Sequence, residues 1–170
     1  MSVREDIDGM LAAARARLVD VPREALGQWR APKKVLGISR APRLWPAGAA
    51  WHLGVLLLTD DALLATGEIV RAREEVRRGF AAESQRERAE VAAAAFRGGF
   101  AEGQAVHIGW HEIDLDAVAV GPAASAASAP LVMREDVVLV AWSPRGALMP
   151  LARYLDEHVA LAVDPPRGAT

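Results

Sequence analysis

Cysteine is missing from this 170-residue chain. Its absence excludes disulfide frameworks, thiolate zinc sites and cysteine nucleophiles. A long hydrophobic run is missing too, because the longest apolar stretch covers only residues 53–58, whereas a membrane-spanning helix needs about 20 residues. The acidic start of the chain is followed by no apolar segment of the kind that signal peptides contain. We therefore expect a cytoplasmic protein.

Neither sign of charge is in large excess. Arginine and lysine number 20, aspartate and glutamate number 22, and the formal net charge is −2. This balance gives no reason to expect nucleic acid as a partner. Hydrophobic residues make up 52% of the chain and charged residues 25%, which is typical of a globular domain.

Three helices are expected, because apolar residues recur at helical spacing in three segments, and a capping box stands before each of the first two. Glycine or proline follows each of them and ends it. The first helix presents an apolar stripe that needs a partner surface, either the rest of the chain or a second copy. The helices are expected at 3–19 after the Ser2–Glu5 capping box, at 84–97 after the Ser84–Glu87 capping box, and from about Pro150 to Pro165.

Runs of apolar residues between turn residues predict about six or seven strands. Residues 50–58 are apolar on both faces, which predicts one central strand. Pro42 and Pro46 are expected to break the chain before it, and the turn at 59–61 makes a hairpin with the next strand. Residues 134–136 are expected to form the turn of a second hairpin. The strands are expected at 33–40, 50–58, 62–66, 105–113, 115–120, 131–133 and 137–142.

Strands joined by short turns pair antiparallel, so the expected fold class is α+β: one antiparallel sheet or open β-barrel with N-terminal, inserted and C-terminal helices. The element order resembles that of pleckstrin-homology-like barrels, a likeness that carries no function. We expect a single domain over 1–170, with a helical element at 1–22 and a loop–helix insertion at 71–98, and mobile loops at 71–83 and 121–130. The expected core includes Trp51, Leu53, Val55, Leu57, Leu139 and Trp142.

Two motifs resemble catalytic or metal sites but lack the context that such sites need. Residues 37–41 (Gly-Ile-Ser-Arg-Ala) come close to a nucleophile elbow, yet Pro42 stands where the following helix must begin. His111 and Glu112 open an H-E-x-x-H zinc pattern, with Leu115 in place of the second histidine. We therefore name no catalytic residue and expect no cofactor.

Two histidines four residues apart, His107 and His111, suggest a metal pair. On a strand four residues span about 13 Å, which is too far for ligands of one ion. Only a helix would bring the two rings together, and the segment is strand-like. We expect partly exposed strand histidines and no metal site.

Acidic residues alternate at Glu112, Asp114 and Asp116, which places them on one face if this segment is a strand. Asp60 and Asp61 lie in a turn. Such carboxylates could carry out acid–base chemistry or hold a cation. A solvated strand face is the alternative, and it is the one that we expect.

A basic stretch between residues 23 and 43 contains six arginines and lysines and one acid, with Trp29 and Trp45 nearby. Basic residues interleaved with aromatic ones could bind a phosphate-bearing ligand or single-stranded nucleic acid. A solvated basic strand edge is the alternative. The candidate residues for binding a small anion are Arg30, Lys33, Lys34 and Arg40.

Three stretches carry a resemblance to a known family: residues 31–35 (Ala-Pro-Lys-Lys-Val), residues 51–58 together with Ala65-Thr66-Gly67, and residues 114–116. Over nearly its full length the chain resembles a family of uncharacterised proteins from high-GC Gram-positive bacteria, some of which are labelled glutaminases. The resemblance implies an amide hydrolase. Serine-type glutaminases use S-x-x-K, however, and no serine of this chain has lysine three places on.

We therefore expect a non-enzymatic binding or protein-interaction module. The alternative is a hydrolase that acts on a small amide. Three amphipathic helices compete for the limited surface of one sheet, and an uncovered apolar stripe is commonly buried in a twofold dimer. We expect a homodimer, with the N-terminal or inserted helix at the contact, and no membrane partner.

Overall fold

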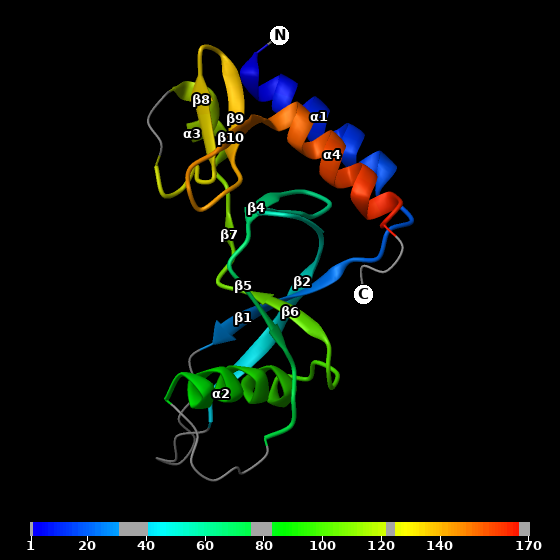
Figure 1. The fold of residues 1–170 in the computed structure, drawn as a ribbon, viewed down its shortest axis with the longest axis vertical. Coiled ribbons are helices and arrows are strands. Elements are labelled where there is room, and N and C mark those ends of the chain that lie inside the picture. Colours follow the sequence, from blue (N-terminus) through cyan, green and yellow to red (C-terminus); the bar gives the residue numbers. More distant parts are fainter. Residues whose placement is uncertain (1, 31–40, 76–82, 122–124, 167–170) are drawn as a thin grey trace. The chain divides into compact units, whose positions relative to one another are not determined.

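A computed structural model describes residues 2–30, 41–75, 83–121 and 125–166, drawn as a ribbon in Figure 1. Within these ranges, none of the helices has the length and apolar character that crossing a membrane requires. The elements in chain order are α1 (Val3–Arg17), β1 (Glu24–Arg30), β2 (Arg43–Leu53), β3 (Leu56–Leu58), β4 (Leu63–Ala65), β5 (Glu68–Arg71), α2 (Glu83–Arg97), β6 (Ala105–Ile108), β7 (His111–Glu112), α3 (Leu115–Val120), β8 (Leu131–Arg134), β9 (Val137–Ala141), β10 (Leu148–Pro150) and α4 (Leu151–Val163).

The fold is α+β, with N-terminal, inserted and C-terminal helices as expected. Seven strands form an open mixed sheet in the order β5-β6-β1-β2-β3-β4-β7, and three more form a sheet in the order β10-β9-β8. The arrangement is not purely antiparallel, because β1 and β6 form a parallel pair in which Ala25 lies opposite Val106. A parallel pair needs a long crossover, and the chain between these strands supplies it.

The chain forms two compact units. Unit 1 comprises Met1–Arg23, Ala50–Thr66 and His111–Thr170, and unit 2 comprises Glu24–Ala49 and Gly67–Trp110. Each unit has its own cluster of buried apolar side chains, and no residue belongs to both clusters. The two units are therefore described separately below.

The core of unit 1 lies between the paired helices α1 and α4 and the strands that they cover (Figure 1). The Ser2–Glu5 capping box forms as predicted, because the Ser2 amide donates to the Glu5 carboxylate over 2.7 Å and the Glu5 amide donates to the Ser2 hydroxyl. Met10 of the predicted apolar stripe is half-buried. The other four residues of the stripe are buried: Ile7, Leu11, Ala14 and Leu18.

The core of unit 2 packs α2 against strands β2, β5 and β6. Its main members are Leu44, Ala95, Phe100 and Val106. The Gly98-Gly99 pair ends α2 as predicted, and Gly98 has no room for a side chain, since a Cβ there would lie 1.5 Å from the Leu44 carbonyl oxygen. This close approach brings the end of α2 onto the start of β2.

Two predicted hairpins are confirmed. Leu58 pairs with Leu63 across the turn at 59–61, and Arg134 pairs with Val137 at the tip of the β8–β9 hairpin. The strand expected at 33–40 lies outside the described residues, as do parts of the two loops expected to be mobile.

The central strand predicted over 50–58 is wrong, because the chain turns at Gly54 and Val55 and forms the antiparallel pair β2–β3. Gly54 has a φ of +65°, a left-handed conformation that glycine adopts without strain. The expected break at Pro46 is also wrong, since β2 runs through it. Apolar periodicity did not reveal a turn that lies within a continuous apolar run.

The strand expected over 115–120 is helix α3 instead. The Asp114 carboxylate accepts a hydrogen bond of 2.9 Å from the Ala117 amide and so caps the helix. The prediction of a Ser84–Glu87 capping box is wrong as well, because α2 begins at Glu83 and Ser84 therefore lies inside the helix.

Three members of the expected core are buried: Trp51, Leu53 and Leu57. Val55 and Leu139 are half-buried. Trp142 contradicts the expectation, with 45% of its surface exposed at the end of β9. The prediction assumed a strand that is apolar and covered on both faces, and at Trp142 the chain has left β9.

The fold makes a prediction for Leu57, which is fully buried in β3. Leu57→Ala should lower the free energy of unfolding by about 2–5 kcal/mol, because a cavity remains where the side chain was. Urea denaturation measures this change. Leu161→Ala is the matched control, since Leu161 is 51% exposed and should change stability by less than about 0.5 kcal/mol. Equal effects of the two substitutions would contradict the strand assignment.

Candidate functional site

An exposed patch in unit 2 brings arginine and tryptophan together. The Arg30 guanidinium carbon of β1 lies 5.3 Å from the centre of the Trp45 ring of β2. Trp45 is 41% exposed and Arg30 is exposed. Since side chains two residues apart on a strand share a face, exposed Gln28 lies on the face of Arg30 and exposed Arg43 on that of Trp45. We call Gln28, Arg30, Arg43 and Trp45 the Arg–Trp face.

Contacts with the core of unit 2 and with helix α2 hold the start of β2 in place. Leu44 points the opposite way from Trp45 and is buried in the core of unit 2. The Arg97 guanidinium, at the end of α2, donates two hydrogen bonds of 3.2 and 3.0 Å to the Pro42 carbonyl and forms an ion pair of 2.6 Å with Glu90. These contacts position the backbone that carries Arg43 and Trp45.

The arginines of the Arg–Trp face differ from Arg23, another arginine that stacks on a tryptophan, in having no carboxylate partner among the described residues. In unit 1, Arg23 lies 4.0 Å from the centre of the Trp51 ring, and both Asp60 oxygens accept its hydrogen bonds. This carboxylate raises the pKa of Arg23, and the arginine lowers the pKa of Asp60. Arg30 and Arg43 have no ion pair within the described part of the chain, so their charge stays available to an anion.

Of the four residues predicted to bind an anion, the structure places Arg30. Lys33, Lys34 and Arg40 lie outside the described residues. The structure adds Arg43, which belongs to the basic stretch but was not among the four candidates, and Trp45, which the sequence placed nearby. The pairing of β1 with β2 could not be read from spacing.

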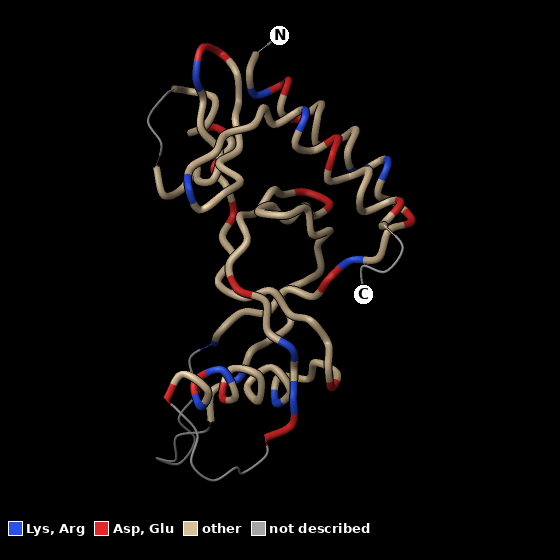
Figure 2. Tube along the Cα trace, viewed as in Figure 1, with Lys and Arg blue, Asp and Glu red and all other residues tan. Residues whose placement is uncertain are grey.

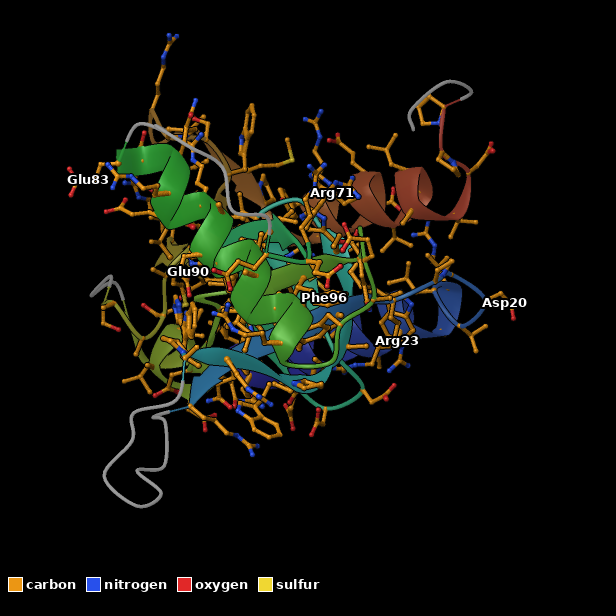
Figure 3. The ribbon with its side chains drawn as sticks, turned by 90° about the horizontal axis from the view of Figure 1, so that it is seen from below. Asp20, Arg23, Arg71, Glu83, Glu90 and Phe96 are labelled. Carbon is orange, nitrogen blue, oxygen red and sulfur yellow. The ribbon has the colours of Figure 1, made fainter. Side chains whose placement is uncertain are left out.

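Charge is divided unevenly between the two units. Unit 2 contains 12 basic and 8 acidic residues, which gives a net charge of +4, whereas unit 1 contains 8 basic and 14 acidic residues, a net charge of −6. The small overall charge therefore hides a basic unit. Helix α2 contributes nothing to this excess, since its arginines and glutamates are equal in number and alternate along it (Figure 2). Side chains of that helix, Glu83 and Glu90 among them, are drawn in Figure 3.

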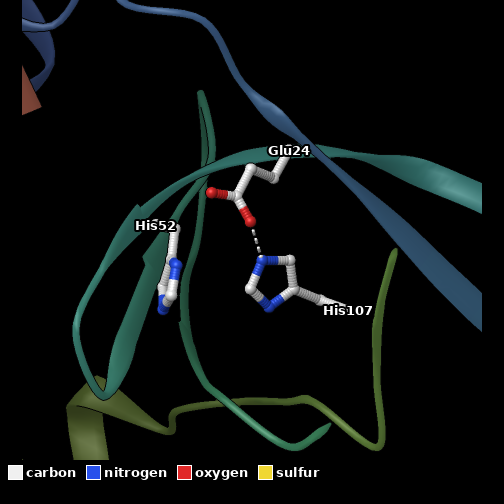
Figure 4. Close-up of side chains that lie close together, drawn as sticks. All are labelled: Glu24, His52 and His107. Carbon is white, nitrogen blue, oxygen red and sulfur yellow. Dashed lines mark hydrogen bonds and ion pairs between the residues drawn. The ribbon is translucent and has the colours of Figure 1, made fainter. Parts of the chain in front are cut away.

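A histidine–carboxylate pair lies elsewhere in unit 2. Nε2 of His107 is 2.5 Å from a carboxylate oxygen of Glu24, which makes a short hydrogen bond (Figure 4). His107 on β6 is fully buried, so the expectation of a partly exposed strand histidine is wrong for it. The neighbouring parallel strands β1 and β6 bring the two residues together, although 83 residues separate them.

The Glu24–His107 pair fits a structural role. A carboxylate that binds one ring nitrogen fixes the orientation and tautomer of the imidazole. A fully buried ring offers no approach to a substrate. His111, the other histidine of the predicted metal pair, lies on β7 of unit 1 and is exposed.

In unit 1, the hydroxyl of Tyr154 holds α4 on the turn between β2 and β3. It donates to the Leu53 carbonyl over 2.9 Å and accepts from the Val55 amide over 2.8 Å. Burial raises the pKa of Tyr154. No motif of the sequence points to this tyrosine, which is the only one in the chain.

His158 stands one turn along α4 from Tyr154, with the ring centres 4.1 Å apart. Burial lowers the pKa of His158, Glu157 opposes this effect, and the nearby His52 adds to it. The turn residue Gly54 lies against both α4 rings, since a Cβ on it would be 2.2 Å from the Tyr154 hydroxyl oxygen.

The acidic residues predicted to share a strand face are separated by the fold. Glu112 lies on β7, Asp114 caps α3, and Asp116 pairs with Arg4 over 2.8 Å. The prediction is wrong because 115–120 is helical. Asp60 and Asp61 lie in a turn as expected, with Asp61 accepting a hydrogen bond from the Thr59 hydroxyl.

Two shallow grooves are the best formed among the described residues, and both are in unit 1. One, of about 180 Å³, lies by α1, β9 and α4 near Met10 and Val138. The other, of about 160 Å³, lies between α1 and α4 near Ala14 and Leu155. Pockets for small organic ligands measure about 300–1,000 Å³, so neither groove is of that size.

No family model, no curated protein and no solved structure matches the chain.

Tyr154→Phe tests the tie between α4 and the β2–β3 turn. Loss of the hydroxyl leaves the Leu53 carbonyl and the Val55 amide without their partner, which should lower the free energy of unfolding by about 1–3 kcal/mol. Urea denaturation measures the loss. A change below about 0.3 kcal/mol would show that water replaces the hydroxyl at no cost.

His158 should make unit 1 less stable in acid. Its pKa is lower in the folded chain than in the unfolded chain, so its contribution is fully present above about pH 6.5 and is lost as the pH falls through the folded value. The melting temperature of His158→Gln should therefore fall less between pH 7.5 and pH 5 than that of the unsubstituted protein. His111→Gln controls for the loss of an exposed imidazole. Parallel falls in all three proteins would refute this assignment.

Proposed function

We propose that the protein is a non-enzymatic binding module, and that its Arg–Trp face binds an anionic, phosphate-bearing ligand. One observation carries this proposal: the exposed Arg30 guanidinium lies over the exposed Trp45 ring, and no carboxylate of the described residues neutralises it. A guanidinium presents several donors to phosphate oxygens, and an indole ring offers a flat apolar surface beside them.

The charge distribution supports the same proposal. Arg43 adds a second cation without an ion pair within the described ranges, and unit 2 as a whole carries a net charge of +4. Such an excess raises the local concentration of anions and speeds their association. The competing explanation, a solvated basic edge, accounts for the two arginines but not for the half-exposed indole beside them.

Three other expectations from the sequence remain proposals: amide hydrolysis, self-association and a cytoplasmic location. An amide hydrolase rests on the family resemblance alone, and no distance or hydrogen bond of the described residues favours it. Self-association as a homodimer remains a prediction, although apolar residues of both α1 and α4 already lie in the core of unit 1 within one chain. We also propose that the protein acts in the cytoplasm.

Binding of an inorganic polyphosphate of defined length tests the proposal. Isothermal titration calorimetry at about 50 mM salt should detect binding that weakens as salt rises, because bound phosphates release their counterions. The double substitution Arg30→Ala with Arg43→Ala should weaken it by about tenfold or more, since each charge-assisted hydrogen bond contributes about 1.5–3 kcal/mol.

Arg145→Ala with Arg153→Ala is the matched control, because both arginines are exposed and belong to the acidic unit 1. This control should bind polyphosphate as the unsubstituted protein does. Absence of binding, or equal loss in the two double variants, would overturn the proposed function.

A further inference from the structure

We infer that the phosphate-bearing ligand of the Arg–Trp face is single-stranded nucleic acid, with an unpaired base stacked on Trp45. This inference rests on the proposed function and narrows its ligand class. It departs from the expectation drawn from the overall charge of −2, because that value sums a basic unit and an acidic one.

The chemistry of the face matches the two parts of a nucleotide. Arg30 and Arg43 offer guanidinium groups to backbone phosphates, while Trp45 offers a ring to a base. Proteins that bind single strands combine these features, a positively charged track for the backbone and aromatic side chains for the bases. Gln28 adds an exposed amide that can both donate to and accept from a base edge.

The shape of the site favours a polymer over a small ligand. The Arg–Trp face lies on two neighbouring strands, β1 and β2, where its four side chains are all exposed. A small ligand gains most of its affinity from enclosure in a pocket, whereas an extended chain gains it from repeated contacts along a surface. The two best-formed grooves of the described residues belong to unit 1 and are small.

Duplex DNA and anionic membranes fit the face less well. Stacking on Trp45 requires a base whose ring faces are free, and in a duplex they are covered by neighbouring bases. The helix of the same unit, α2, carries equal numbers of arginine and glutamate and so offers no basic helical face to the major groove. A membrane-binding surface would pair its cations with several exposed apolar side chains, and the Arg–Trp face has one.

Fluorescence anisotropy with a labelled 15-nucleotide oligothymidylate tests this inference. The full chain should bind this oligonucleotide at least about 10-fold more tightly than polyphosphate with the same number of phosphates, since only the oligonucleotide can stack. A duplex of the same length and phosphatidylserine vesicles are tested in parallel, and both should bind more weakly than the single strand.

Trp45→Ala should weaken oligothymidylate binding by about 5- to 150-fold and leave polyphosphate binding unchanged. Trp45→Phe should restore part of the loss, because phenylalanine keeps an aromatic ring. Trp142→Ala is the matched control: Trp142 is 45% exposed, against 41% for Trp45, but lies in the acidic unit 1. Circular dichroism establishes that each variant is folded.

The outcomes separate this inference from the proposed function. If oligothymidylate and polyphosphate bind equally and Trp45→Ala changes neither, the nucleic-acid inference is wrong and the anion site stands. If vesicles or duplex bind more tightly than the single strand through Trp45, the inference is likewise wrong. If no phosphate-bearing probe binds, both proposals are wrong.

Discussion

The architecture of unit 1 depends on the two hydrogen bonds that the Tyr154 hydroxyl forms with the turn between β2 and β3. A single oxygen satisfies the Leu53 carbonyl and the Val55 amide at the point where β2 turns into β3. Without such a partner, the buried Leu53 carbonyl and the half-buried Val55 amide would each lose a hydrogen bond at this turn. The same contact docks α4, which packs along α1 and closes the core. Gly54 permits this arrangement, because any side chain there would collide with the tyrosine.

Unit 2 follows a different principle at the start of β2, where one side of the strand is buried in the core beside a helix and the other side bears exposed side chains. Leu44 and Trp45 are neighbours on β2 and show this division, since one lies in the core and the other is half-exposed beside Arg30. Arg97 fixes the start of the strand from the helix side. A binding surface placed on a strand held in this way is preorganised, because its side chains project from backbone that packing and hydrogen bonds already hold. Of the two units, the one that carries this surface has the net positive charge.

Sequence reasoning succeeded where the signal is local. The Ser2–Glu5 capping box and the turn at 59–61 each depend on residues within a few positions of one another. It failed where the same local pattern is compatible with two secondary structures. Residues 115–120 alternate well enough for a strand, but the Asp114 carboxylate caps a helix there. The run from 50 to 58 is apolar throughout, so its periodicity could not show where a turn interrupts it.

By itself, the sequence determined the class of the fold, the positions of its three longer helices, and the exclusion of cysteine chemistry, because composition and short-range periodicity decide these features. It also located a basic stretch with tryptophans nearby. Only the tertiary structure decided which of those residues meet. Arg30 and Trp45 are 15 positions apart and face one another because β1 and β2 are neighbours in a sheet. Glu24 and His107 are 83 positions apart and meet for the same kind of reason. Long-range strand pairing depends on how the whole chain buries its apolar surface, and no local pattern specifies it.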